Sequence, residues 1–252
     1  MTAPRLALTC AVALAAATLV PTTANAASSF VWASFGTERN PIVKCGPMQI
    51  AKRIEEITGR KQEIHLGQSA FANPRKLYAQ VARGVTDFTW GILSYSPGRF
   101  PMTEIVALPF VARNNKAAAR AMNTLAPKYL AKEFRDVKML AIAMPGLYQI
   151  HLKKPVENIA TGLKGLRLRV VGSGLTDTIR ALGADVVALP MPAAYENLQK
   201  GVIGGLLGPN AGLVAFKLHE VTDYHIEADI AGSLVFAALS KKFWNSLTDA
   251  QR

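Results

Sequence analysis

The chain has 252 residues, with 29 Lys and Arg against 17 Asp and Glu, and a formal net charge of +12. Half of its residues are hydrophobic, which excludes a disordered chain, and its two cysteines exclude a disulfide-rich scaffold. The length suits one large domain or two small ones. A basic chain of this kind first suggests nucleic-acid binding, so the N-terminal segment has to be considered next.

Residues 1–26 have the features of a secretory signal peptide. Arg5 precedes an uncharged apolar run over residues 6–20, and Ala24-Asn25-Ala26 has the small-x-small pattern of a cleavage site. The run is shorter than the roughly 20 residues of a membrane span, although an uncleaved signal anchor is the alternative. We predict cleavage near Ala26 and an extracytoplasmic mature chain.

Export changes the meaning of the charge and of the cysteines. The sequence has neither zinc-finger spacing nor a block of Arg and Lys, so we expect no nucleic-acid partner. Cleavage would remove Cys10 and leave Cys45 alone, which excludes an intrachain disulfide in the mature chain. We expect Cys45 to be a buried structural thiol rather than a reactive one.

The periodicity of apolar residues predicts alternating strands and helices. In the first half, strands are expected at residues 30–35, 62–66, 86–92 and 137–143, with helices at 43–58, 74–85 and 115–132. After Pro145-Gly146 the pattern starts again, with strands at 147–152, 164–171, 185–189 and 234–240 and helices at 173–182, 192–200, 211–219 and 242–251. This order predicts an α/β protein with parallel strands and right-handed crossovers.

The break and restart predict two α/β lobes. We assign residues 27–146 to lobe I, completed by about 233–252, and residues 147–232 to lobe II. The chain then crosses between the lobes near Gly146 and near Gly232, and two crossings imply a hinge.

The sequence offers no catalytic arrangement. It contains no Gly-x-Ser-x-Gly, no Walker A motif and no Gly-x-Gly-x-x-Gly. Its four histidines are scattered, and the loose pair His219 and His225 is better explained as a helix end followed by a strand than as a metal site. We expect no catalytic residue, no metal and no cofactor.

Several ordered motifs resemble those of the solute-binding proteins of TRAP transporters, the DctP type. The most specific are Leu-Lys-Gly-Leu-Arg-Leu-Arg-Val at residues 163–170, Leu-Pro-Met-Pro at 189–192, and the segment 195–205, which ends Gly-Val-Ile-Gly-Gly. Residues 77–87, 107–110, 217–221 and 242–251 also fit the family pattern. The resemblance covers essentially all of the chain after the signal peptide.

The resemblance implies a two-lobed periplasmic receptor that closes on a small organic anion, usually a carboxylate, and delivers it to TRAP membrane permease subunits. The family's carboxylate-binding arginine corresponds to Arg169, and a guanidinium suits bidentate recognition of a carboxylate. Arg167, two residues earlier on the same strand, is expected to be a surface arginine that does not contact the solute. A monomer is expected.

Departures from the family pattern narrow the expected solute. Tyr148 stands where many members carry a second arginine, and Gly208, Ile92 and Gly204 replace polar or charged family residues. Because a cleft tolerates such losses only where the ligand offers no polar partner, we expect a monocarboxylate, or a keto or hydroxy acid, with an apolar or aromatic body. The expected binding residues are Arg169, Tyr148, Trp90, Asn210, Tyr95 and Phe35.

Alternatives exist for individual residues and for the function. Core packing explains Trp90 and Phe35 as well as ligand contact does. A ligand sensor for a sensor kinase and, less favoured, an enzyme on the same fold are the competing functions. The chain is also short for the resembling family, whose members continue past the segment at 242–251, so a C-terminal truncation that removes the rest of lobe II and a hinge helix is expected.

Overall fold

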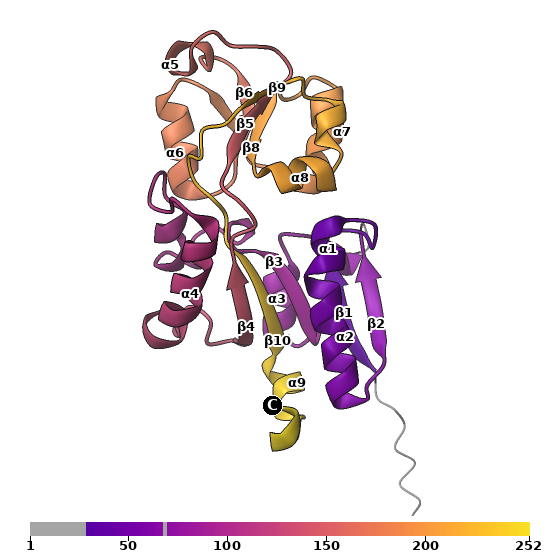
Figure 1. Cartoon of the computed structure of the whole chain (residues 1–252). Helices are drawn as coiled ribbons and strands as arrows, with labels where there is room; N and C mark the ends of the chain where they lie inside the picture. The colour runs from indigo at the N-terminus through magenta and orange to yellow at the C-terminus, as the bar shows by residue number, and fades with distance from the viewer. Residues whose placement is uncertain (1–28, 68–69) are drawn as a thin grey trace, which may run out of the picture.

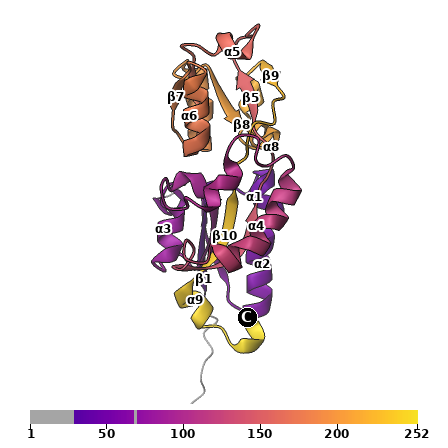
Figure 2. The ribbon, with the colours of Figure 1, turned by 90° about the vertical axis from the view of Figure 1, so that its left-hand side faces the viewer.

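The structure, a computed structural model, describes residues 29–67 and 70–252. The predicted signal peptide, Ala26 and Cys10 lie outside these residues. Two five-stranded sheets, each flanked by helices, form two bodies stacked end to end, which we call lobe I and lobe II (Figures 1 and 2). The predicted α/β class and the two-lobed architecture are confirmed.

Lobe I is built on a mixed sheet with the order β2-β1-β3-β10-β4. Its strands are β1 (Phe30–Ser34), β2 (Gln62–Leu66), β3 (Phe88–Ile92), β4 (Val137–Ala143) and β10 (Val235–Ser240). The first three are parallel, as the strand and helix alternation predicts, whereas β10 runs antiparallel to both β3 and β4. A segment from the end of the chain therefore completes the sheet that the start of the chain begins.

Helices cover both faces of this sheet, and β1, β4 and β10 carry apolar side chains on both sides. They are α1 (Pro41–Cys45), α2 (Pro47–Thr58), α3 (Leu77–Ala82), α4 (Asn115–Tyr129) and α9 (Lys241–Asn245). One buried cluster contains Phe30, Trp32 and Phe35, and a second contains Tyr78, Phe100 and Phe236. The predicted helix over 43–58 is split in two, because Gly46 separates α1 from the proline that starts α2.

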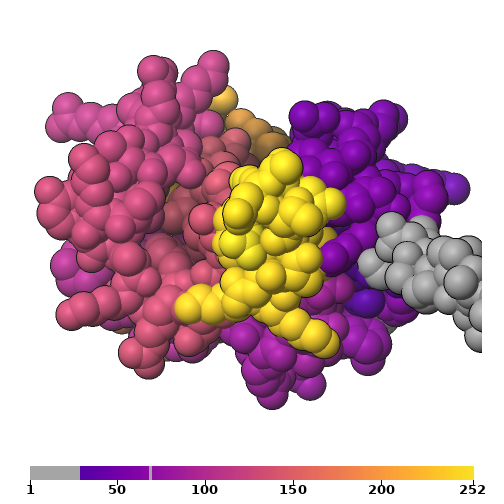
Figure 3. Space-filling view, turned by 90° about the horizontal axis from the view of Figure 1, so that it is seen from below, coloured from indigo at the N-terminus to yellow at the C-terminus, as the bar shows by residue number. Residues whose placement is uncertain are grey.

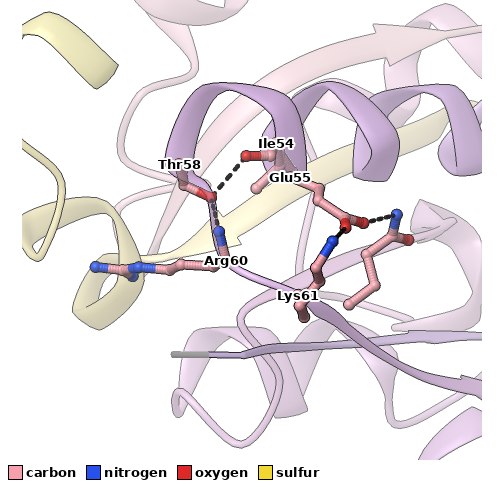
Figure 4. A network of polar contacts seen from close by, with 6 residues as sticks. Ile54, Glu55, Thr58, Arg60 and Lys61 are labelled. Atoms are coloured by element: carbon pink, nitrogen blue, oxygen red, sulfur yellow. Dashed lines mark hydrogen bonds and ion pairs between the residues drawn. The ribbon is translucent and has the colours of Figure 1, made fainter. Parts of the chain in front are cut away.

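The end of α2 is fixed to the strand that follows it (Figure 4). The Thr58 hydroxyl donates to the carbonyl of Ile54 over 2.7 Å and accepts from the backbone N–H of Arg60 over 3.2 Å. Glu55 forms an ion pair with Lys61 over 2.8 Å. Gly59, at φ 68°, supplies the left-handed residue that ends the helix. These contacts direct the chain into β2.

Lobe II has a second mixed sheet with the order β7-β6-β8-β5-β9. Its strands are β5 (Gln149–Leu152), β6 (Arg167–Arg169), β7 (Asp185–Val187), β8 (Gly205–Gly208) and β9 (Tyr224–Ile226). Its helices are α5 (Ile159–Gly162), α6 (Ser173–Ala181), α7 (Ala194–Gln199) and α8 (Asn210–Ala215). The strand β8, which the sequence reading omits, lies in the middle of this sheet and pairs with both β5 and β6.

Two crossing segments connect the lobes, and they are hydrogen-bonded to each other. The Tyr148 N–H donates to the carbonyl of Ala231, and the Ile230 N–H donates to the carbonyl of Tyr148. Gly232 lies against Met144, where an added Cβ would come within 2.6 Å of the Met144 sulfur. The crossings therefore form one paired ribbon close to the predicted positions at Gly146 and Gly232, and the boundaries assigned to the lobes, including 233–252, remain expectations.

The C-terminal residues lie between the two edges of the lobe I sheet. Figure 3 shows them, in yellow, between the N-terminal segments in indigo and the segments in pink. The Lys138 ammonium of β4 lies over the ring of Trp244 on α9, 4.3 Å from the ring centroid. On the other side, the Arg60 guanidinium donates to the Ser246 hydroxyl over 2.8 Å. Contacts to both sides hold this segment in place.

One edge of the lobe I sheet is β4, and a side chain partly covers it. The Asn123 amide on α4 accepts from the Ile142 N–H over 3.0 Å and donates to the Ile142 carbonyl over 2.5 Å. Asn123 thus bonds to both backbone groups that a neighbouring strand would otherwise use.

Two further findings concern single features. Cys45 is exposed at the end of α1, so the expectation of a buried thiol is wrong, because the helix that carries it ends there and turns its last residue outward. Among the described residues, no helix is long and apolar enough to cross a membrane.

Candidate functional site

The site is built around Arg169, the last residue of β6. Arg167 and Arg169 lie two residues apart on β6 and so share one face of the sheet, but they stand at opposite ends of the strand. Arg167 is exposed and donates to the carbonyl of Gly201 over 3.1 Å, whereas Arg169 has a relative exposure of 0%. The predicted contrast between the two arginines is therefore present in the geometry.

Three N–H groups of the buried guanidinium have protein partners. Nε donates to the carbonyl of Leu189 over 2.9 Å, and Nη1 donates to the carbonyl of Leu207 over 3.0 Å. Nη2 donates to the Tyr95 hydroxyl over 3.2 Å. A guanidinium has five N–H groups, so one on each terminal nitrogen is left for another acceptor.

No carboxylate of residues 29–67 or 70–252 lies within 4 Å of Arg169. A buried charge without a counter-ion is costly, because neutral carbonyls replace only part of its hydration. The arrangement is therefore incomplete without an anion.

Tyr95 brings lobe I to this cation. It ends the 3₁₀ helix Leu93–Tyr95 that follows β3, and it is buried. Its hydroxyl oxygen accepts from Arg169 and, over 2.9 Å, from the backbone N–H of Met191, and both donors belong to lobe II. Because the oxygen accepts both bonds, the proton of the hydroxyl is free to donate to a third group.

A small apolar cavity lies between the lobes beside this cluster. Lobe I contributes Phe35, Ile42, Trp90, Ile92 and Val235, while Met191, Pro209, Gly212 and Phe216 come from lobe II. Pro145, Tyr148 and Ser233, from the two crossing segments, complete the wall. Among the described residues, no ionisable side chain other than Tyr148 lines the cavity.

Aromatic rings dominate the cavity wall. Phe35 stacks on Trp90 with ring centroids 4.6 Å apart, and it faces Phe216 with nearly parallel planes at 6.3 Å. The indole N–H of Trp90 donates to the Ser34 hydroxyl over 2.8 Å. Because that polar atom is already satisfied, the Trp90 ring presents its apolar surface to the cavity.

The polar end of the cavity is a chain of hydroxyl groups. The Tyr148 hydroxyl donates to Ser233 over 2.6 Å, and Ser233 lies 3.1 Å from the hydroxyl of Ser94. Burial raises the pKa of Tyr148, while the nearby Arg169 guanidinium acts in the opposite direction. Tyr148 therefore remains a neutral hydroxyl at neutral pH.

A second cavity, of about 410 Å³, lies on the other side of Tyr148 and Ser233. Glu104 of lobe I and Ser173, at the start of α6 in lobe II, both line it. The Glu104 Oε2 atom is 3.5 Å from the Ser173 hydroxyl, and its buried Oε1 atom has no hydrogen-bond partner among the described residues. Burial raises the pKa of Glu104 above its usual value.

The cleft opens into a wide groove of about 2020 Å³ with a basic lining. Its ionisable side chains are Arg39, Arg75, Lys76 and Lys217, and no Asp or Glu of the described residues lines it. The Arg75 guanidinium donates to the carbonyl of Ala188 over 2.8 Å, which forms another contact between the lobes. A cleft mouth with one sign of charge attracts anions.

Comparison with known proteins gives the family. The sequence profile of the bacterial extracellular solute-binding protein family 7, DctP, matches residues 33–252. The chain belongs to this family. The resemblance inferred from the motifs is confirmed, and the arrangement of the two sheets agrees with solved structures of DctP-type proteins.

Two of these structures are similar along most of the chain. A TRAP solute-binding protein from an unidentified marine metagenome microbe, specific for aromatic acid ligands and solved with metahydroxyphenylacetate, is 28% identical, with a TM-score of 0.83. The TRAP solute-binding protein of Rhodoferax ferrireducens, solved with copurified benzoate, is 27% identical, also with a TM-score of 0.83. In both cases the similarity covers 89% of this chain and 72% of the other.

A curated relative is named for a different class of ligand. The chain is 23% identical over 189 residues to the C4-dicarboxylate-binding periplasmic protein DctP of Rhodobacter capsulatus. The match covers 73% of this chain and 56% of that protein, so the chain spans little more than half of the relative's length.

The DctP-type fold brings together five of the six residues singled out in the sequence. Phe35, Trp90 and Tyr148 line the apolar cavity, and Tyr95 and Arg169 bond to each other at its edge. Arg169 itself does not line the cavity. Asn210 is not brought into this group: it begins α8 with an exposed side chain and is absent from the cavity wall.

Four residues of the site were not singled out in the sequence. Phe216 and Met191 come from lobe II, Ser233 from the second crossing, and Glu104 from a 3₁₀ helix of lobe I. Met191 contributes mainly a backbone N–H, which no side-chain pattern reveals. The sequence signal for Met191 is the family motif Leu-Pro-Met-Pro at 189–192, which contains it.

Proposed function

We propose that this protein is a periplasmic receptor that binds an aromatic or similarly apolar monocarboxylate between its lobes and delivers it to a TRAP-type permease. The observation that carries the proposal is Arg169, a fully buried cation that has no counter-ion among the described residues and lies beside an aromatic cavity. The solute's carboxylate would supply the missing negative charge, and its body would occupy the cavity.

The chemistry of the carboxylate end follows from the unused donors. Arg169 has one free N–H on each terminal nitrogen, which suits the two oxygens of a carboxylate. The proton of the Tyr95 hydroxyl is a further donor from the opposite lobe. A carboxylate held by both residues binds lobe I to lobe II, so solute binding stabilises the closed state.

The rest of the cavity favours an apolar body. Phe35, Trp90 and Phe216 offer ring faces, and the polar nitrogen of Trp90 is already bonded. A second carboxylate here would be desolvated without a cationic partner, because no Lys, Arg or His lines the cavity. The hydroxyls of Tyr148 and Ser233 can accept one polar substituent, such as a hydroxy or keto group.

The similar structures support this solute class. The marine metagenome protein and the R. ferrireducens protein are described with aromatic monocarboxylates. The solute-binding role described for the family also favours a receptor over an enzyme, and we propose that the bound acid is released unchanged. Permease subunits as partners, a monomeric state, and export with cleavage near Ala26 belong to the same proposal.

The test is isothermal titration with a matched panel of solutes. Benzoate, 3-hydroxybenzoate and mandelate are the acids, benzamide is the uncharged control for benzoate, and succinate and malate represent C4-dicarboxylates. We expect at least one aromatic acid to bind and benzamide to bind at least about 100-fold more weakly, since the buried cation would remain unpaired. Tight binding of succinate without binding of any aromatic acid contradicts the proposal.

A second measurement separates a receptor from an enzyme. The acid that binds is incubated with the protein and recovered, and its mass and amount are compared with a sample that received no protein. We expect both to be unchanged. Time-dependent conversion that scales with protein concentration would contradict the receptor assignment.

A further inference from the structure

Lobe II carries a pair of histidines that the solute site does not use. His151 lies on β5 and His225 on the neighbouring edge strand β9, directly opposite each other in the antiparallel register. Their Nδ1 atoms are 3.0 Å apart. His219 is the histidine nearest to His225 in the sequence, but the sheet pairs His225 with His151.

The backbone fixes the tautomer of His151. Its Nε2 atom is 3.1 Å from the carbonyl of Gly208, and a carbonyl only accepts, so Nε2 carries the proton and donates it. The Nδ1 atom of His151 therefore presents a lone pair toward His225. An imidazole whose second nitrogen donates to a backbone carbonyl is the usual arrangement of a metal-binding histidine.

Burial keeps this lone pair available. His151 has a relative exposure of 1%, and burial lowers its pKa to about 4, so its ring is neutral at neutral pH. His225 is exposed, and its ring is free to tilt away from a direct hydrogen bond. His151 is thus a fixed ligand, and His225 above it is an adjustable one. A metal ion can reach them from solvent at the edge of the sheet (the β5 and β9 labels in Figure 1).

We propose that His151 and His225 form a binding site for one divalent transition-metal ion of the copper or nickel type, held by the two Nδ1 atoms. The ion displaces the hydrogen bond between the rings. The Nδ1 proton of His225 leaves to solvent and Nε2 of the same ring takes one up, so the ring stays neutral and the charge of the protein does not change.

The distance between the nitrogens selects the class of metal. With metal–nitrogen bonds of about 2.0–2.1 Å, two nitrogens 3.0 Å apart subtend roughly 95° at the metal. That angle suits square-planar or octahedral coordination and is smaller than the tetrahedral angle of about 109° that zinc prefers. Divalent copper also has the highest affinity among first-row metals for nitrogen ligands.

Water completes the coordination. Within residues 29–67 and 70–252, no group of three or more His, Cys, Asp or Glu side chains is arranged to hold a metal ion, so no third side chain of these types joins the pair. A two-nitrogen site is expected to bind reversibly and to leave the remaining positions of the ion open to solvent.

The test measures Cu²⁺ and, separately, Ni²⁺ binding to the full chain, purified without a polyhistidine tag. The key variant is His225→Ala, which changes an exposed residue on an edge strand and should not disturb the fold. His219→Ala is the matched control, because His219 is also an exposed histidine of lobe II and makes no histidine contact. Circular dichroism and thermal melting without metal check that both variants fold.

We expect one Cu²⁺ equivalent in the unmodified protein and in His219→Ala, with an electron paramagnetic resonance spectrum showing two imidazole nitrogens. Changes outside the ligand shell alone cost about 10–100-fold in metal affinity, so loss of a ligand in His225→Ala should cost at least about tenfold. His225→Gln preserves a hydrogen bond to His151 but should lose the metal to the same extent. Equal Cu²⁺ affinity in His225→Ala and His219→Ala, or a spectrum with fewer than two imidazole nitrogens, overturns the proposal.

Discussion

The two walls of the cleft differ in how fully their polar and charged groups are paired within the protein. The lobe I wall consists of aromatic rings packed into a core, and its polar atom at Trp90 already has a partner. The lobe II wall contains Arg169, whose charge has no counter-ion among the described residues and whose donors are only partly used. This difference assigns capture of the anion to lobe II and selection of its body to lobe I.

The largest expected effect comes from removing the charge of the lobe II wall. Arg169→Gln should weaken binding of the aromatic acid by at least about 100-fold, since truncating one partner of a buried charge pair costs about 2–5 kcal/mol. Isothermal titration measures it. Arg167→Gln, a change at the exposed start of the same strand, should stay within about twofold.

Arg169→Lys sharpens this test. It retains the positive charge but loses the planar fork, so affinity should fall between the values for the native protein and Arg169→Gln. If Arg169→Gln folds, as judged by circular dichroism, and binds as well as the native protein, the assignment of anion capture to lobe II is wrong.

The next effect concerns the bond between the walls. Tyr95→Phe removes the acceptor of two lobe II donors, Arg169 Nη2 and Met191 N–H, and leaves them unsatisfied in the closed state. An unsatisfied buried donor costs about 1–3 kcal/mol, so affinity should fall by about tenfold. Small-angle scattering should also show a larger open fraction at a given solute concentration.

Tyr195→Phe is the control for Tyr95→Phe. Its hydroxyl donates to Glu220 within lobe II, at the surface and away from the cavity wall. Its affinity and scattering profile should match those of the native protein. Equal losses in both variants would show that the Tyr95 hydroxyl has no particular role in closure.

A smaller effect tests selection by the rings. Phe216→Leu keeps an apolar side chain but removes the ring that faces Phe35. Aromatic pairs contribute about 0.5–1.5 kcal/mol beyond burial, so benzoate should bind about three- to tenfold more weakly while cyclohexanecarboxylate changes less. Tyr129→Leu, at an exposed site on α4, should change neither, and equal losses for both solutes would contradict ring-face recognition.

The smallest effect is a pH dependence from Glu104. Its pKa is raised by burial in the closed structure, so closure takes up a proton and the apparent solute affinity should rise as the pH falls from 8 toward 5. In Glu104→Gln the apparent solute affinity should depend less on pH, and the slope between pH 8 and pH 5 should be roughly two- to threefold smaller. Comparing the two proteins at each pH cancels the titration of the solute, and identical slopes would exclude a contribution from Glu104.

Much of the fold was predictable because its elements follow local patterns. The strand predicted over 137–143 agrees with β4, and the helix predicted over 173–182 agrees closely with α6. The strand β8 was missed, because Gly205 and Gly208 have low strand propensity and mark a turn in isolation. Gly205 lies so close to β5 that an added Cβ would come within 2.5 Å of the His151 carbonyl, a reason for glycine that only the sheet reveals.

The site was predictable where a residue belongs to a family motif and unpredictable where backbone groups and distant segments meet. Arg169 followed from the Leu-Arg-Leu-Arg-Val motif at 166–170, whereas its greater burial than Arg167 does not follow from strand alternation, because residues two apart share a face. The bond from the Met191 N–H to Tyr95, and the approach of Phe216 to Phe35, depend on how the lobes meet, which no local pattern contains. The same limit placed Asn210 in the expected site although it faces solvent.

The amide of Asn123 on the edge strand β4 has a consequence for molecules that meet one another. A sheet edge with free N–H and C=O groups can recruit a strand from another copy, which is how many β-proteins begin to aggregate. At Ile142 this side chain already takes the place of such a strand. When copies of the receptor are crowded together, a strand of one copy therefore cannot pair with β4 of another at Ile142. The sheet is protected there from extending into a second molecule.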